Sequence, residues 1–223
     1  IAYRFVPIKY TENRNPNVLG GFASDLMYDK IMNDFQWGGM DNVEGEGVYM
    51  DENNRRMADN LRLQLSNLAE QLIEEDKDQK ALDILFKTIE VTPENNLPYD
   101  KIMLPLIESL YELSSADTSR TAAAISSHLT QEQRDLALEK AHFVGDRLFT
   151  IFEQEMEDYL SLDPEYVNQI TDDFALMKQV NERIEQVVRF YHEDDPKVQE
   201  YQDRLDDLER KLIAKQSGVR DLG

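Results

Sequence analysis

Residues 51–56 (DENNRR) place carboxylate, amide and guanidinium side chains in one short stretch. Together such groups can bind a sugar, a peptide or a cation. The same residues can also begin a helix, because Asp51 or Asn53 can cap its first turn and an acid there complements its positive end. We favour this structural interpretation, in which Arg55 or Arg56 pairs with acids of the N-terminal segment.

Other groups of reactive residues lack the spacing that chemistry requires. Residues 41–47 (DNVEGEG) are rich in oxygen but lack the alternating acids and distant glutamate of a calcium loop. Paired carboxylates can hydrolyse glycosides, yet with 45 acids chance pairs are common. The histidines, at positions 128, 142 and 192, show no metal-ligand spacing, and the chain has no cysteine. The sequence therefore predicts no catalytic residue, no metal and no cofactor.

Aromatic residues near the N-terminus offer a different kind of site. Trp37, with Phe35 and Tyr49, could form a ligand platform, but such aromatics more often pin an irregular segment onto a helix pair. We expect pinning. Residues 25–35 have helical spacing, with Ser24 or Asp25 as the expected cap. The candidate aromatic and acidic cluster comprises Trp37, Tyr49, Asp51, Arg55 and Arg56.

The charge of the chain limits its partners. The formal net charge is −21, so phosphate backbones and anionic lipid headgroups are repelled and a nucleic-acid partner is excluded. A plain solvated acidic surface explains the charge, and a site for a basic protein or peptide is the alternative. No apolar run approaches the roughly 20 residues of a membrane helix.

Apolar residues of the central region recur every third or fourth position, which is typical of amphipathic helices. One face of the first helix is formed by Met57, Leu61, Leu65, Leu68 and Leu72. A return helix is expected over 79–91, followed by Pro93. The intervals from Leu65 to Pro93, with small Ala69 and Ala81 between larger residues, match the tetratricopeptide pattern of two antiparallel helices.

The remaining sequence predicts further helices. A second, less regular unit begins near Pro98, and residues 114–130 are either a loop insertion or a poorly packed helix. A long helix is expected over 131–161. Residues 170–191 and 198–212 have heptad spacing and predict a helical hairpin. Asn181 either fixes the register inside its seam or points outward at the seam edge.

These patterns predict an all-α fold, a tetratricopeptide-like stack of antiparallel helix pairs with an irregular N-terminal wrap and a C-terminal hairpin. We place residues 1–51 in the wrap, 52–162 in the helical pairs and 163–223 in the hairpin, as one continuous domain. Tetratricopeptide units bind partners along a groove formed by their first helices. The candidate groove residues are Asn60, Gln64, Asn67, Gln71, Asp100 and Met103.

Two strings, residues 35–40 (FQWGGM) and 48–57 (VYMDENNRRM), resemble the start of the soluble C-terminal region of a bacterial family of multi-pass membrane proteins of unassigned function. Its membrane part resembles protein O-mannosyltransferases, and its soluble part a tetratricopeptide-type domain. The likeness covers residues 1–113 well, is weaker over 114–130 and resumes near 159. It implies a periplasmic domain, tethered to the inner membrane by upstream helices, with any transferase chemistry outside this chain.

From the residues and the resemblance together we expect a non-catalytic scaffold that holds a protein partner or acceptor. The alternative is a structural module that packs on its own membrane domain or on a second copy.

Overall fold

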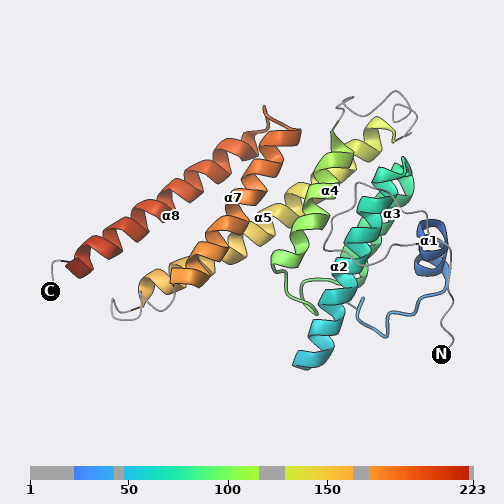
Figure 1. The fold of residues 1–223 in the computed structure, drawn as a ribbon, viewed down its shortest axis with the longest axis horizontal. Helices are drawn as coiled ribbons and strands as arrows, with labels where there is room; N and C mark the ends of the chain where they lie inside the picture. Colours follow the sequence, from blue (N-terminus) through green and yellow to red (C-terminus); the bar gives the residue numbers. More distant parts are fainter. Residues whose placement is uncertain (1–22, 43–47, 116–128, 163–170, 221–223) are drawn as a thin grey trace. The chain divides into compact units, whose positions relative to one another are not determined.

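The computed structural model describes residues 23–42, 48–115, 129–162 and 171–220, and this part of the chain is all-helical, without a strand (Figure 1). It divides into two compact units, the first reaching Pro98 and the second beginning at Tyr99. The sequence had placed boundaries after residues 51 and 162. The division falls elsewhere because the helices that follow Tyr99 share one core with the C-terminal helices.

Helix α1 (Ser24–Asn33) opens the first unit and packs against α3 and α2. Ile31 is its buried anchor, at 1% exposure. The expected cap is wrong, since the N-cap position is Ala23 and no side chain caps the helix. Ser24 instead donates to a carboxylate oxygen of Glu75 at 2.5 Å, because the start of α1 lies beside the end of α2.

Helices α2 (Glu52–Glu74) and α3 (Asp78–Val91) form the body of the first unit and pack along each other. Asp51 caps α2 by accepting a hydrogen bond from the backbone N–H of Asn54 at 2.8 Å, as the structural interpretation predicted. Ala69 of α2 and Ala81 of α3 are fully buried.

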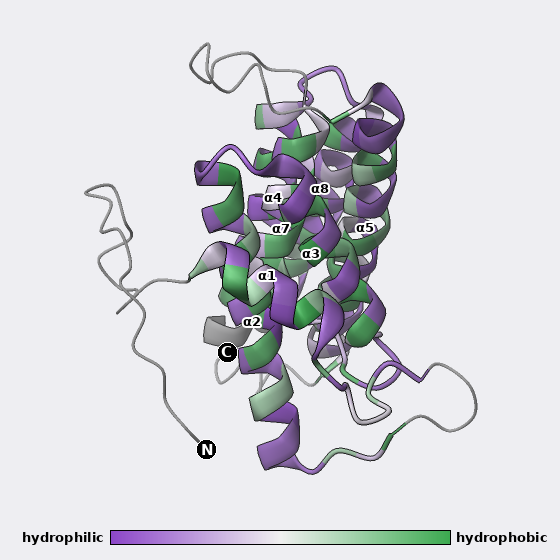
Figure 2. Cartoon of the chain, turned by 90° about the vertical axis from the view of Figure 1, so that its right-hand side faces the viewer, coloured by the Kyte–Doolittle hydropathy of each residue, from purple (hydrophilic) through white to green (hydrophobic). Residues whose placement is uncertain are grey.

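Helix α2 is longer than its partner. It has 23 residues and α3 has 14. Because the two are joined at the end of α2, roughly its first two turns extend beyond α3. Figure 2 shows this free end largely in hydrophilic colours. Met57, which the apolar spacing placed inward, is therefore 70% exposed.

The second unit contains η1 (Lys101–Met103), α4 (Leu104–Ser114), α5 (Gln131–Ser161), α7 (Thr171–Tyr191) and α8 (Pro196–Arg220). A capping box, in which Thr130 and Gln133 satisfy each other's backbone N–H groups, starts α5. The bounds of α5 are those expected from the sequence. Helix α7 packs against α4, α5 and α8, so its apolar residues serve three neighbours. Residues 116–128, where a loop or a weak helix was expected, lie outside the described residues.

Asn181 illustrates that shared packing. It is fully buried, and its amide nitrogen donates to the backbone carbonyl of Phe149 on α5 at 3.3 Å. The outward alternative is therefore wrong. The residue contacts α5, because α7 is surrounded by helices and not confined to one seam.

Candidate interaction surface

A buried arginine holds the first unit together beneath the free end of α2. Arg62 is a charged residue between Leu61 and Leu63 in the sequence, and it is fully buried. Its guanidinium donates to the carbonyls of Thr92, Leu97 and Pro98 at 3.0, 2.8 and 3.1 Å, and to the Thr92 hydroxyl at 3.2 Å. Asp59, one turn earlier, lies 3.6 Å away. The segment after α3 is thereby fixed against α2.

Asn96 holds the N-terminal segment in the same way. Its amide nitrogen donates to the carbonyls of Met40 and Asn42 at 2.8 and 2.7 Å, and its oxygen accepts from the Val48 N–H at 3.0 Å. One side chain thus satisfies three backbone groups on both sides of residues 43–47. This role could not be predicted from the sequence, because an asparagine in a turn after a helix is common.

The aromatic residues expected to pin that segment do so only in part. Phe35 and Trp37 contact each other, with ring centroids 5.8 Å apart, but Phe35 is 42% exposed. Tyr49 is 91% exposed and pins nothing. Pinning by Tyr49 is therefore wrong, and the physical reason is that Asn96 already holds the backbone on either side.

The outward face of α2 carries a row of amide side chains. Asn60, Gln64, Asn67 and Gln71 recur at intervals of four, three and four residues, which places them on one face of the helix. Asn60 and Gln64 are exposed and Asn67 is half-buried. Gln71 donates to Glu75 at 2.7 Å. The other three make no hydrogen bond through their side chains to any described residue, so they are available to a ligand.

The two remaining groove candidates belong to the second unit. Asp100 is the cap of η1 and accepts from the Ile102 N–H at 2.9 Å. Met103 is completely buried in the core of that unit. It cannot line an open surface, because its apolar side chain packs inside beneath the start of α4. Asn60 and Gln64 are the fully exposed members of the predicted groove.

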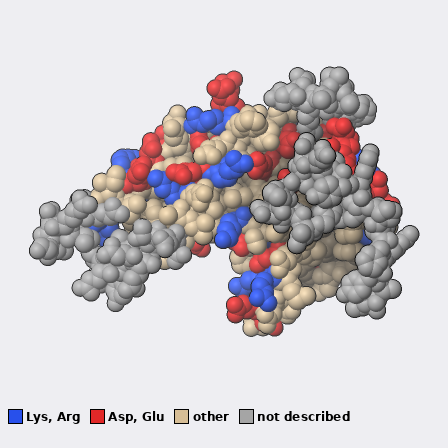
Figure 3. Space-filling model, viewed as in Figure 1, with Lys and Arg blue, Asp and Glu red and all other residues tan. Residues whose placement is uncertain are grey.

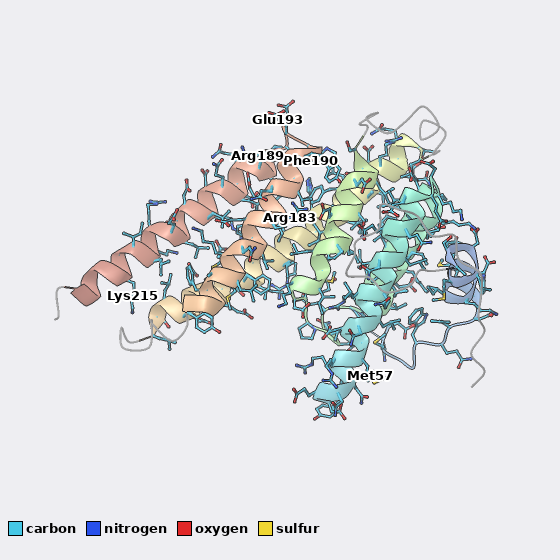
Figure 4. The ribbon with its side chains drawn as sticks, viewed as in Figure 1. Met57, Arg183, Arg189, Phe190, Glu193 and Lys215 are labelled. Carbon is cyan, nitrogen blue, oxygen red and sulfur yellow. The ribbon has the colours of Figure 1, made fainter. Side chains whose placement is uncertain are left out.

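The free end of α2 is the most exposed part of the helix, and all of residues 52–57 are exposed. Figure 4 shows Met57 at this projecting end. In Figure 3 basic side chains gather there, with acidic ones beside them. The side chain of Asp51 already accepts a hydrogen bond from the backbone N–H of Asn54 as the cap of α2. Arg55 and Arg56 form no ion pair with the described residues, so the expected pairing with acids of the N-terminal segment is absent there.

The second unit contains a cluster of titratable residues that the sequence did not reveal. His142 on α5 lies 2.8 Å from a carboxylate oxygen of Asp195, in the turn after α7. The ring of His192 lies 2.7 Å from the hydroxyl of Ser114 at the end of α4. Tyr111 lies between the two imidazoles, at centroid distances of 5.8 and 6.1 Å. These residues are far apart in the sequence, so only the packing of the helices brings them together.

A serine beside a histidine suggests nucleophilic chemistry, which requires a base oriented by a third group. Ser114 also contacts the carbonyl of Tyr111, donating to it at 2.8 Å. The hydroxyl hydrogen therefore points to that carbonyl and not to the imidazole. No described carboxylate lies within hydrogen-bond distance of His192. Burial lowers the pKa of His192, although Asp195 opposes that shift. The arrangement ties the end of α4 to the turn after α7.

A second polar group in the same unit joins α5 to α8. The hydroxyl of Tyr201 donates to Asp146 at 2.6 Å, and the ammonium of Lys197 pairs with the other oxygen of Asp146 at 2.8 Å. Burial raises the pKa of Tyr201 far above its ordinary value, so the phenol stays a donor. Each member has a partner that satisfies it. We therefore interpret this group as a structural link between α5 and α8.

Within the described part of the chain, no three acidic or histidine side chains converge to hold a metal ion. Among the same residues no helix has both the length and the apolar character needed to cross a bilayer. Comparisons with protein-family models, with curated proteins and with solved structures found no match to this chain.

Proposed function

We propose that this chain is a non-catalytic interaction module that holds a segment of a protein partner along the outward face of α2. The observation that carries the proposal is the row formed by Asn60, Gln64 and Asn67, whose amides have no partner among the described residues. A primary amide offers both a donor and an acceptor, as a peptide group does. A row of them on successive turns suits an extended peptide backbone.

The packing of α2 on α3 supports a tetratricopeptide-like arrangement as part of this proposal. Ala69 and Ala81 have no exposed surface, and Leu72 and Leu85 are equally buried. Small residues at the crossing let the two helices approach closely, while larger ones fill the space on either side. Stacked helix pairs of this type present extended surfaces to partners and bury their own apolar faces.

We also propose a location for the module, which rests on the family resemblance. The module would lie on the periplasmic side of the inner membrane, tethered to a glycosyltransferase-like membrane part that carries any catalysis. Tethering raises the local concentration of a held acceptor without requiring high affinity. Reading the sequence upstream of Ile1 tests this directly. Many apolar spans there would support the tether, and a signal peptide alone would remove the link to a transferase.

The binding proposal is tested by photo-crosslinking in cells that express the full-length parent. A benzophenone amino acid is placed at Asn60 or Gln64, with Glu90, on the exposed side of α3, as the control position. We expect an adduct from the first two positions and none from Glu90. The crosslinked peptide is then identified by mass spectrometry and synthesised.

Binding of that synthetic peptide to the purified chain decides the outcome. Replacing Asn60, Gln64 and Asn67 by alanine should weaken binding by at least about tenfold, since each lost hydrogen bond contributes about 0.5–1.5 kcal/mol. Equal adducts at Glu90, or unchanged affinity of the alanine variant, would refute the proposal.

Exposed apolar side chains favour a second candidate, self-association through the second unit. Phe190 is 79% exposed, and Phe143 and Ile213 are each 59% exposed. A second copy of this chain is the occupant that would cover them. Light scattering should then show a concentration-dependent dimer that Phe190→Ser or Ile213→Ser weakens. A strict monomer at all concentrations would exclude this candidate. Asn181 plays no part in it, because the residue is buried within its own unit.

A further inference from the structure

Two adjacent arginines stand out in a chain that has far more acids than bases. Acidic residues number 45 and basic residues 24. In the described part of the first unit, the other basic side chains pair with acids: Lys30 with Asp34, Arg62 with Asp59, Lys77 with Asp25 and Glu75, Lys80 with Asp25, and Lys87 with Glu90. Arg55 and Arg56 have no such partner there. Their charges are available to an external anion.

Apolar side chains of the kinds enriched at interfaces accompany these arginines. Tyr49 is 91% exposed and Met57 is 70% exposed. Tyrosine, methionine and arginine are all over-represented in protein interfaces, and each contributes more when its partner excludes water. These four residues lie within one short stretch of the sequence that also contains the exposed acids Asp51 and Glu52, and we call this stretch the α2 tip.

The α2 tip continues the amide row. Arg56 lies four residues before Asn60, and Met57 lies three before it, so both fall on the same face of the helix. At the helix start the side chain of Asp51 already accepts the N–H of Asn54. The surface is built from side chains.

We propose that Tyr49, Arg55, Arg56 and Met57 form a docking surface for an acidic, partly apolar segment of a partner protein. The inference rests on the proposed function and specifies the partner's chemistry. Carboxylates would pair with the two guanidinium groups, which bind them in a bidentate fashion, and an apolar side chain would cover Met57 and Tyr49. The net charge of −21 disfavours a phosphate backbone or an anionic bilayer at the same place. It also suggested a basic partner; at the α2 tip the two guanidinium groups without an ion pair among the described residues favour carboxylates, with Asp51 and Glu52 lying beside them in the sequence.

The test measures fluorescence anisotropy with three labelled peptides of equal length added to the full chain. One alternates glutamate with leucine, the second glutamate with serine, and the third lysine with leucine. We expect the glutamate–leucine peptide to bind best and to weaken as salt shortens the range of the charge interaction. The Arg55→Glu and Arg56→Glu double variant should lose roughly tenfold in affinity, and Met57→Ser should bind more weakly than the unaltered chain.

A matched control reverses Arg210 and Lys215 of α8 to glutamate, which changes the net charge by the same amount and should leave binding intact. Equal binding of all three peptides, no binding of the glutamate–leucine peptide, or equal loss in the control would overturn the inference. Circular dichroism of each variant checks that it folds like the unaltered chain. If crosslinking at Asn60 persists while peptide selectivity is absent, this inference fails and the proposed function stands.

Discussion

Replacing Arg62 by methionine tests the account of the first unit most directly. The change removes every hydrogen bond that the guanidinium makes while keeping a long side chain in the space. It leaves the carbonyls of Thr92, Leu97 and Pro98 without that donor. Orphaned buried acceptors cost about 1–3 kcal/mol each, and the relieved desolvation of the arginine offsets part of this cost.

We expect a net loss of about 3–5 kcal/mol, because three orphaned acceptors together cost more than the relieved desolvation returns. Domains of this size are stable by about 5–15 kcal/mol, so the loss should be large on that scale. Arg62→Lys should be intermediate, because an ammonium keeps the charge but cannot reproduce a planar fork that donates to several carbonyls.

The assay is urea unfolding followed by the fluorescence of Trp37, the single tryptophan of the chain. Because Trp37 lies in the first unit, its signal reports that unit. Arg56→Met on the same helix is the control, since that residue is exposed and unpaired among the described residues, and it should change the stability by no more than about 0.5 kcal/mol. A loss below about 1 kcal/mol for Arg62→Met would refute the reasoning.

Three further predictions concern single side chains. Asn96→Ala removes three hydrogen bonds to segment 40–48, so hydrogen exchange in that segment should speed up while exchange in the second unit stays the same. Burial lowers the pKa of His192 below its ordinary 6.5. As the pH falls through about 6.5, this histidine is therefore protonated in the unfolded state before it is in the folded state, and the second unit loses stability. The melting temperature of His192→Gln should therefore depend less on pH between about 7.5 and 5 than that of the unaltered chain, and parallel curves would contradict this. Gly145→Ala should raise stability by about 0.5–1 kcal/mol, because the added carbon would meet nothing closer than the Tyr201 hydroxyl at 3.5 Å; a fall in thermal stability would show that the site has no room for it.

Helical spacing predicted the elements well because it depends only on which side chains need burial. It placed α5 at its observed bounds and positioned α2 and α3 within a few residues. The residue types predicted a cap at Asp51 or Asn53, and Asp51 is the one that caps α2. Local chemistry was sufficient for these predictions, since each involves residues within one or two turns of one another.

The contacts that the sequence did not predict involve partners far along the chain. Asn96 binds backbone groups more than fifty residues away, and His192 meets Ser114 across 78 positions. Met103 was assigned to a surface because the start of a helix pair usually contributes to the groove, but its side chain packs inward. None of these roles is encoded in local spacing, because each depends on which helices become neighbours.

Arg56 and Arg62 show how the length of a partner helix divides one helix into two environments. They are the same residue type on the same helix, six positions apart. Arg62 lies where the segment after α3 crosses α2, and the carbonyls of that segment surround its guanidinium. Arg56 lies beyond the end of α3, where the unit supplies neither apolar cover nor described acceptors. Residues 52–57 therefore contribute little to the core of the first unit, which begins at Ala58 on this helix, and a substitution among them should cost little stability.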